Sequence, residues 1–312
     1  MYDIIGDIHG YATQLKQLLS KLGYSEGAEG WSHPERKVIF LGDFVDRGPE
    51  QVEVVEIAGQ MVESGSALAV MGNHEFNAVA YATPDPRNAG EYLRPRTEKN
   101  RKQHGEFLRQ VGEDSAQHRE IVDWFRTLPL WLDLEDFRVV HACWHEEHLA
   151  GLRSFLDQTN AIKTEAWQDL TAKDTGPFAS AEVILKGLEI PLPEGVSFKD
   201  KDGHVRTDIR TRWWEKRRLT FRELAIAPSE VIERIPHEPV PDDVIPGYHD
   251  EKPVFVGHYW MQGEPKPMSD KVACLDYSVA ADKGGKLCAY RWDGNAELSS
   301  ERMVWVERAV QS

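Results

Sequence analysis

The sequence has few cysteines and no long apolar run. Its three cysteines, Cys143, Cys274 and Cys288, are odd in number and have no close CxxC spacing, which excludes a disulfide framework and a thiolate zinc site. No apolar stretch approaches the roughly 20 residues that span a bilayer, and the first residues are charged and strand-like rather than a basic region followed by an apolar stretch. We therefore expect a cytoplasmic protein that does not bind membranes.

Positive charge is also scarce. Lys and Arg number 37 against 52 Asp and Glu, so the formal net charge is −15. This balance argues against non-specific binding of duplex nucleic acid or of anionic membranes. The length of 312 residues allows a large core, and we expect one domain, 1–312, with an inserted cap subdomain at about 150–250.

Three short apolar segments in the first quarter of the chain each lead into a glycine followed by metal-ligand residue types. Residues 3–5 precede 6–10, residues 38–41 precede 42–48, and residues 68–71 precede 72–75. Apolar residues at helical spacing lie between them, at 15–22 and 52–62. The resulting β-α-β-α-β order, with right-handed crossovers, puts the three loops at the carboxyl edge of one sheet.

The pattern recurs later in the chain. Strand-like residues 137–140 end at His141, and residues 253–256 end at Gly257 and His258. Residues 107–128 are predicted to be mostly helical. Residues 150–250 are rich in proline and carry a basic cluster, which favours the inserted cap. The β-rich segments 272–279, 286–292 and 303–306 suggest a second sheet packed on the first.

The residues at the strand ends form a set of oxygen and nitrogen ligands: Asp7, His9, Asp43, Asn73, His141 and His258. Carboxylate, amide and imidazole ligands without thiolate suit divalent Mn, Fe, Co, Ni or Zn. Six ligands with one carboxylate free to bridge indicate two ions, and we expect Asp43 to be the bridge.

Together these motifs carry a family resemblance. GDIHG at 6–10, GDFVDRG at 42–48, GNHE at 72–75, His141 and the Gly257–His258 pair resemble the calcineurin-like metallophosphoesterases, within them the serine/threonine phosphoprotein phosphatase branch. Bacterial diadenosine tetraphosphatases and the phosphatase module of bacterial polynucleotide kinase-phosphatases share the pattern. The resemblance is close over the first 80 residues and limited to short motifs afterwards.

The resemblance implies a fold and a ligand set. The fold is an α/β, four-layer αββα sandwich of two mixed β-sheets flanked by helices. Asp7 and His9 would hold one ion with the bridging Asp43. The second ion would be held by Asn73, His141 and His258.

A mechanism follows from the residues and from the family. A hydroxide that bridges two divalent ions would attack phosphorus in line with the leaving oxygen. His74 would protonate the leaving group and Asp46 would orient His74. Arg47 would bind the phosphoryl oxygens through its planar guanidinium, and Asn73 would also contact the substrate.

The cap region departs from the family pattern. No recognisable motif supplies a second phosphate-binding arginine, and Arg206, Arg210 and Arg212 are the candidates. The alternative interpretation of the basic cluster that contains them is a solvated face of the cap. Trp213 and Trp214 could stack on a nucleobase, but aromatic residues of an inserted cap more often form its own small core.

The sequence therefore predicts a dinuclear metal-dependent hydrolase, with Mn²⁺ the expected metal and Fe, Zn, Co and Ni the alternatives. Its expected substrate is a phosphomonoester, either a phosphoprotein of the phosphoserine or phosphothreonine type or a small molecule. A dinucleoside polyphosphate, as for a bis(5'-nucleosyl)-tetraphosphatase, and a nucleic-acid phosphoester are the alternatives. An inactive relative that serves as a binding or regulatory module is the alternative of another class.

Overall fold

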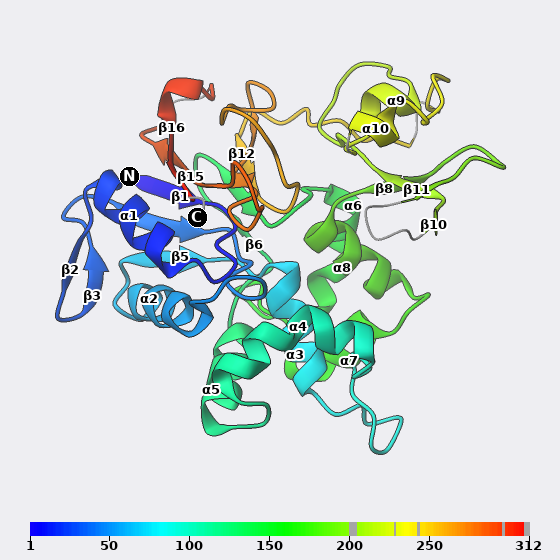
Figure 1. Ribbon diagram of the computed structural model, residues 1–312. Helices are drawn as coiled ribbons and strands as arrows, with labels where there is room; N and C mark the ends of the chain where they lie inside the picture. The colour runs from blue at the N-terminus through cyan, green and yellow to red at the C-terminus, as the bar shows by residue number, and fades with distance from the viewer. Residues whose placement is uncertain (200–204, 228, 242–243, 295–296, 309–312) are drawn as a thin grey trace.

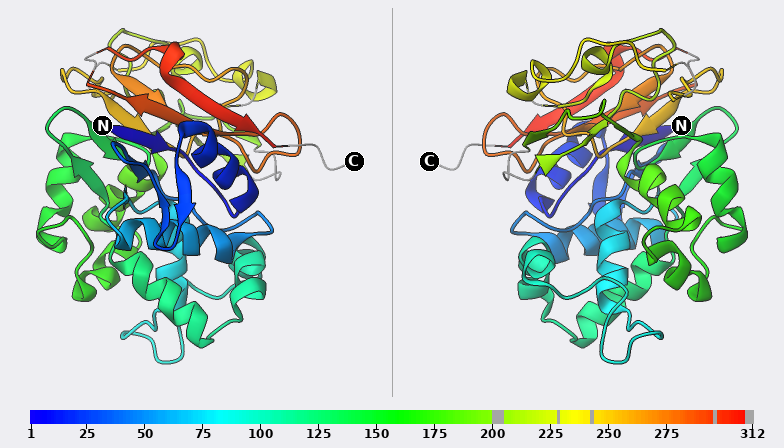
Figure 2. Two further views of the ribbon diagram at one scale, coloured as in Figure 1. Left: turned by 90° about the vertical axis from the view of Figure 1, so that its left-hand side faces the viewer. Right: turned by 90° about the vertical axis from the view of Figure 1, so that its right-hand side faces the viewer.

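The computed structural model describes residues 1–199, 205–227, 229–241, 244–294 and 297–308. Two β-sheets pack face to face, with helices on their outer sides (Figures 1 and 2). This is the predicted sandwich of two mixed sheets flanked by helices. Among the described residues, no helix combines the length and the apolar character needed to cross a bilayer.

The first sheet holds the three N-terminal strands of the β-α-β-α-β unit. β1 (Tyr2–Ile5), β4 (Lys37–Phe40) and β5 (Ala67–Ala69) are parallel and adjacent, as predicted. β15 (Lys286–Trp292) pairs antiparallel with β1 and carries β14 (Asp276–Tyr277) and β16 (Met303–Glu307). A separate hairpin joins β2 (Ser25–Gly27) to β3 (Gly30–Ser32).

The second sheet has the order β13-β12-β7-β6. Its strands are β6 (Trp131–Asp133), β7 (Arg138–Val140), β12 (Val254–Val256) and β13 (Val272–Cys274). The prediction that all the C-terminal strands build the second sheet is therefore wrong in part. Only β13 joins it, whereas β14, β15 and β16 extend the first sheet, because β15 pairs along the whole of β1.

Alternation along the strands places the core between the sheets. Ile4 of β1 and Phe255 of β12 belong to the same buried cluster, whereas their neighbours Ile5, Val254 and Val256 point to the outer faces and the helix-side core. Successive side chains of a strand point to opposite faces. Each sheet is therefore buried on both sides, which is why its strands read as continuous apolar runs.

The helices of the main body are α1 (Ala12–Leu22), α2 (Gln51–Glu63), α3 (Asn73–Ala82), α4 (Glu98–Val111), α5 (Ala116–Arg126), α6 (Glu146–Leu152), α7 (Trp167–Thr171) and α8 (Gly176–Lys186). Short 3-10 helices are η1 (Arg153–Phe155), η2 (Thr164–Ala166) and η3 (Ser300–Arg302). The predicted helical segment 107–128 is two helices, because the chain turns at Gly112, whose φ is 77°.

The predicted cap contains two kinds of structure. Residues of α6, α7 and α8 pack into the main core. The following segment has small elements and a hydrophobic cluster of its own, around Ile190, Ile209 and Leu224, and its helices lie at one end of the molecule (Figure 1). These elements are β8 (Glu189–Pro191), β9 (Phe198–Lys199), β10 (Val205–Arg206), β11 (Asp208–Arg210), α9 (Phe221–Leu224) and α10 (Ser229–Ile232). The boundaries 150–250 remain a prediction.

Candidate metal centre

Residues that follow five strands meet around the carboxylate of Asp43. The Oδ2 atom of Asp43 lies 3.7 Å from Nε2 of His9, 3.8 Å from Nε2 of His74 and 3.5 Å from Nε2 of His141. These separations are too long for hydrogen bonds. They are close to the spacing of about 3.4 Å between two tetrahedral ligands that each lie about 2.1 Å from one ion.

Two groups of potential ligands share Asp43. His9, Asp43 and His74 offer atoms that lie within 4.8 Å of one another, and so do Asp43, His141 and His258. A single carboxylate common to two groups is the arrangement that a bridging ligand requires. The sequence predicted Asp43 for this place.

The imidazole rings are oriented by backbone carbonyls. Nδ1 of His9 lies 3.1 Å from the Val45 carbonyl oxygen, and Nδ1 of His141 lies 2.7 Å from that of Leu41. A carbonyl only accepts hydrogen bonds, so each Nδ1 donates, and each Nε2 is left on the side of Asp43, where it could bind a metal. This is the orientation that holds histidine ligands in metal sites.

Asn73 brings an amide oxygen between two histidines. Its Oδ1 lies 3.2 Å from Nε2 of His141 and 2.7 Å from Nδ1 of His258. Within the described residues, His9 Nε2, His258 Nε2 and Asp7 Oδ1 are buried and have no hydrogen-bond partner. Buried polar atoms without partners are costly, and the donor set fits divalent cations that would satisfy them.

Asp7 approaches from β1 and contacts the loop that carries His258. Its Oδ2 accepts a hydrogen bond of 3.0 Å from the His258 backbone N–H. A Cβ at position 257 would lie 2.0 Å from Asp7 Oδ1, so only glycine fits there. The glycine of the Gly257–His258 pair is thus explained by the close approach of Asp7.

Burial and charge shift the pKa values of His9 and His141 in opposite directions. Burial, with smaller effects from neighbouring groups, lowers the pKa of His9 to about 3, so His9 is neutral at neutral pH, as a metal ligand must be. Burial also lowers the pKa of His141, but the nearby negative charge of Asp43, with smaller effects from Asp7 and the Leu41 carbonyl, outweighs burial and raises that pKa to about 10. The negative field that favours a proton on His141 equally favours a metal cation.

Unusual backbone conformations gather at this centre. Ten non-glycine residues of the described chain have a positive φ, and six of them lie here: His9, Asp43, Asp46, Arg47, His258 and Trp260. Such conformations cost on the order of 1–3 kcal/mol each and concentrate at functional sites.

Glu75 holds the strained Asp43 loop in place, a role that the sequence analysis missed. Its buried carboxylate accepts backbone hydrogen bonds from Asp43 (2.7 Å), Phe44 (2.8 Å) and Gly72 (3.0 Å). Burial and the nearby charge of Asp43 raise its pKa to about 7. The available sequence signal was its third position in α3, where a glutamate closes a capping box.

His74 and Asp46 form the predicted pair. Nδ1 of His74 lies 2.5 Å from Asp46 Oδ2, and the His74 backbone N–H donates to Asp43 Oδ1 at 3.0 Å. Burial lowers the pKa of His74, but the charges of Asp43 and Asp46 outweigh it and raise that pKa. His74 can therefore carry a proton on the ring edge that faces Asp43.

Arg47 is exposed at the rim of the centre and lies over an aromatic ring. Its Cζ atom is 4.2 Å from the ring centroid of Trp260, and that ring is 6.1 Å from the ring of His9. Trp260 is held by its backbone N–H, which donates to the buried Asp276 at 2.7 Å. The sequence analysis singled out neither Trp260 nor Asp276, because no motif contains them.

The three cap arginines lie in different environments. Arg210 is half-buried, its Nε atom is buried without a hydrogen-bond partner, and its charge adds to burial in lowering the pKa of His258. Arg206 and Arg212 are exposed. Of the three, Arg210 is thus the one that the structure places within electrostatic reach of the centre.

The two cap tryptophans are part of the protein core. Trp213 is fully buried, and its Nε1 donates to the Ala142 carbonyl oxygen at 3.2 Å and to the Tyr259 hydroxyl at 2.9 Å. Trp214 is buried against Tyr259, with 5.7 Å between ring centroids. Neither ring is available to stack on a nucleobase. The prediction of a core role is therefore right, but the tryptophans belong to the main core and not to a small core of the cap.

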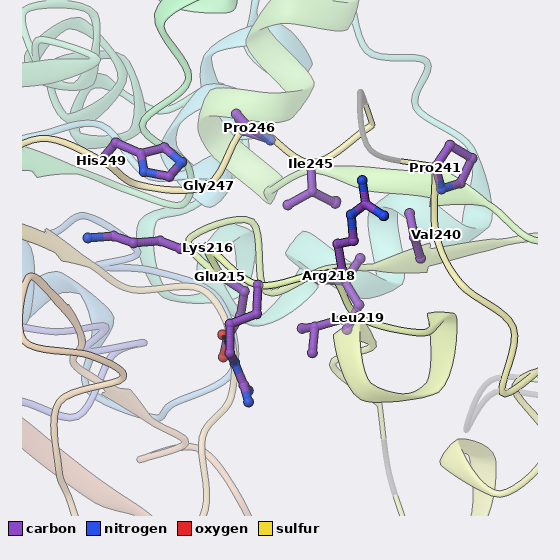
Figure 3. Close-up of a pocket in the computed structure, with 12 residues that line it drawn as sticks. Glu215, Lys216, Arg218, Leu219, Val240, Pro241, Ile245, Pro246, Gly247 and His249 are labelled. Atoms are coloured by element: carbon purple, nitrogen blue, oxygen red, sulfur yellow. Dashed lines mark ion pairs between the residues drawn. The ribbon is translucent and has the colours of Figure 1, made fainter.

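A pocket of about 220 Å³ lies in the cap, apart from the predicted ligands. Figure 3 shows Lys216 and His249 on one side and Val240 and Pro241 on the other, with Ile245 and Arg218 between them. None of the predicted metal ligands or catalytic residues lines it.

Comparisons with known proteins agree with this geometry. A family model described as calcineurin-like phosphoesterase matches residues 2–258. The chain is 30% identical over 151 residues to the asymmetrical bis(5'-nucleosyl)-tetraphosphatase PrpE of Oceanobacillus iheyensis, which is 48% of this chain and 58% of that protein. It is 42% identical over 74 residues to the PrpE of Halalkalibacterium halodurans, 23% of this chain and 30% of that protein. The matches thus span less than two thirds of these relatives.

A solved structure supports the fold. That of a protein serine/threonine phosphatase from Saccharomyces cerevisiae, with similarity to human phosphatase PP5, aligns with a TM-score of 0.52 and 14% identity. The alignment covers 100% of this chain and 81% of that one. At this identity the likeness concerns the fold alone.

Proposed function

Because the chain belongs to the calcineurin-like phosphoesterase family, and so is a metal-dependent hydrolase of phosphoester bonds, we propose that it cleaves a dinucleoside polyphosphate at the centre around Asp43. The convergence of His9, His74 and His141 on the carboxylate of Asp43 is the observation that supports metal-dependent hydrolysis. The names of the PrpE relatives support the substrate class. These names favour a dinucleoside polyphosphate, which the sequence analysis gave as an alternative, over the phosphomonoester that it placed first.

Two divalent ions would be held by the residues that the sequence predicted. Asp7, His9 and Asp43 would hold one, and Asn73, His141 and His258 would hold the other together with Asp43. When bound, such ions generate a nucleophile from water at neutral pH and stabilise the charge of the phosphoryl group. Mn²⁺ is our proposal for the metal, with Fe, Zn, Co and Ni as alternatives, because the ligand set contains no thiolate.

The proton for the leaving oxygen would come from His74. Its Nδ1 is committed to Asp46, so Nε2 is the atom that can donate. Asp46 keeps the ring in this tautomer and stabilises its charged form. General-acid catalysis would thus come from His74, with Asp46 holding the ring.

Arg47 would bind the phosphoryl group. Its guanidinium is exposed and can offer two parallel donors to phosphoryl oxygens. The Trp260 ring beneath it fixes the plane of the guanidinium through a cation–π contact. Asn73 would also contact the substrate.

The substrate class is tested by initial rates. Metal-stripped protein refilled with Mn²⁺ should hydrolyse diadenosine tetraphosphate at least a hundredfold faster than a phosphothreonine peptide at equal concentration. The reverse preference would establish the second candidate, a phosphomonoesterase of the serine/threonine phosphatase branch, with which the chain shares the GDFVDRG and GNHE motifs. No turnover of either substrate by metal-loaded protein would contradict both.

Arg210 is expected to bind a phosphate of the substrate. Replacing Arg210 with alanine should raise KM by about tenfold or more and leave kcat nearly unchanged, because a hydrogen bond to a charged group is lost from substrate and transition state alike. Steady-state kinetics measure both values. The exposed Arg212→Ala and Arg206→Ala are the matched controls, and an equal effect of all three would reduce the role of Arg210 to the general charge of the cap.

A further inference from the structure

A second histidine contacts Asp46, from a part of the chain without any motif. His104 lies on α4, and its side chain is only 5% exposed. Its Nδ1 atom is 2.7 Å from Asp46 Oδ1, whereas His74 Nδ1 is 2.5 Å from Asp46 Oδ2. The carboxylate therefore lies between two imidazoles, with one oxygen directed to each.

The direction of these hydrogen bonds follows from the charge of Asp46. Burial raises the pKa of Asp46, but the charges and hydrogen bonds of His104 and His74 outweigh it and hold that pKa well below its usual value. An ionised carboxylate only accepts hydrogen bonds, so both Nδ1 atoms donate. The contact thus fixes the tautomer of His104.

Aromatic neighbours fix the ring of His104. The ring centroid lies 5.4 Å from that of Tyr81 and 4.9 Å from that of Phe107. Its Nε2 atom is buried and has no hydrogen-bond partner among the described residues. Across the described parts of the chain, the only hydrogen bond of this side chain is therefore the one to Asp46.

A carboxylate held at one oxygen can rotate about its side-chain bonds, whereas one held at both oxygens cannot. We propose that His104 is a positioning residue: it fixes the plane of the Asp46 carboxylate and, through it, the orientation of the proton-donating ring of His74. Without His104, Asp46 Oδ1 would be a buried acceptor without a partner, and the carboxylate would turn toward other donors. The inference rests on the proposed role of His74.

The kinetic test uses esters that need a proton to different degrees. With Mn²⁺-loaded protein, His104→Leu should lower kcat about tenfold for phenyl phosphate, whose leaving group is a poor one. The loss should be less than threefold for 4-nitrophenyl phosphate, whose leaving group departs more readily. KM should stay the same. His104→Asn should restore most of the rate, because an asparagine amide can donate from nearly the position of Nδ1.

The chain offers a matched control. His118 on α5 is also buried and packs against Phe107, with 5.8 Å between ring centroids, but its Nδ1 accepts from the Asp114 backbone N–H. His118→Leu should change both ester rates by the same factor. Equal losses on the two esters in His104→Leu as well would overturn the inference, since they would indicate packing alone.

A second readout does not depend on turnover. The proton between His74 Nδ1 and Asp46 should give a low-field NMR resonance that is identified by its absence in His74→Asn. In His104→Leu this resonance should broaden or move upfield, and in His104→Asn it should stay in place. An unchanged resonance in His104→Leu would overturn the inference even if the protein hydrolysed neither ester. That outcome would leave the proposed function standing, because its substrate is a dinucleoside polyphosphate; only absence of turnover of diadenosine tetraphosphate counts against it.

Discussion

Replacing Asp43 with asparagine is expected to remove metal binding and hydrolysis together. The substitution keeps the shape of the side chain and the oxygen that accepts the His74 backbone N–H. It removes the negative charge on which the Nε2 atoms of His9, His74 and His141 converge. Metal catalysis of phosphoryl transfer is worth several kcal/mol, so the rate should fall by about 10³-fold or more.

Metal content and rate should be measured on the same preparation after dialysis and refilling. Wild-type protein should hold two ions per chain, and Asp43→Asn should hold one or none. Asp3→Asn is the control. Asp3 is a fully buried carboxylate on β1, the strand that precedes Asp7, but it pairs with Arg36 and Arg291. Two retained ions with near-normal turnover in Asp43→Asn would show that another residue bridges them.

The residues that meet around Asp43 could be predicted because they follow strands directly. A strand is recognised by its apolar run, and parallel strands bring their carboxyl ends to one edge. His141 and His258 come from the second sheet, yet they meet Asp43 because the two sheets pack face to face. A position directly after a strand therefore indicated the residues that meet at Asp43, whichever of the two sheets contains the strand.

The residues that support the ligands could not be predicted in the same way. His104 reaches Asp46 from the middle of α4, and Trp260 reaches Arg47 from a loop whose shape depends on the buried Asp276. These contacts depend on how a helix and a loop pack in three dimensions, which no local pattern encodes. The same reason left Arg206, Arg210 and Arg212 equivalent in the sequence, although of the three Arg210 is the half-buried one whose charge lowers the pKa of His258.

The number of strands in each sheet could not be predicted from local sequence patterns either. The segments 272–279, 286–292 and 303–306 have the composition of strands, and they are strands. Which sheet each one joins depends on pairing partners far away in the chain, such as β1 for β15. Long-range pairing decided the topology, whereas composition decided only the element type.

His74→Asn is expected to separate proton donation from metal binding. The asparagine amide can keep the contact to Asp46, but the ring edge that carries the proton is lost, so kcat should fall by about 10²- to 10⁴-fold. KM and the metal content should change little, because the proposed ligands all remain.

The metal content decides between two roles that the geometry allows His74. Its Nε2 lies within ligand distance of the group formed with His9 and Asp43, so it is placed both as an acid and as a ligand. Asp46→Asn is the matched variant, because it weakens the orientation and the charged form of the ring but leaves the Nε2 atom of His74 in place. Two retained ions and a low kcat in both variants would support the acid. Loss of one ion in His74→Asn alone would make His74 a ligand, and the proton would then have to reach the leaving oxygen from another group.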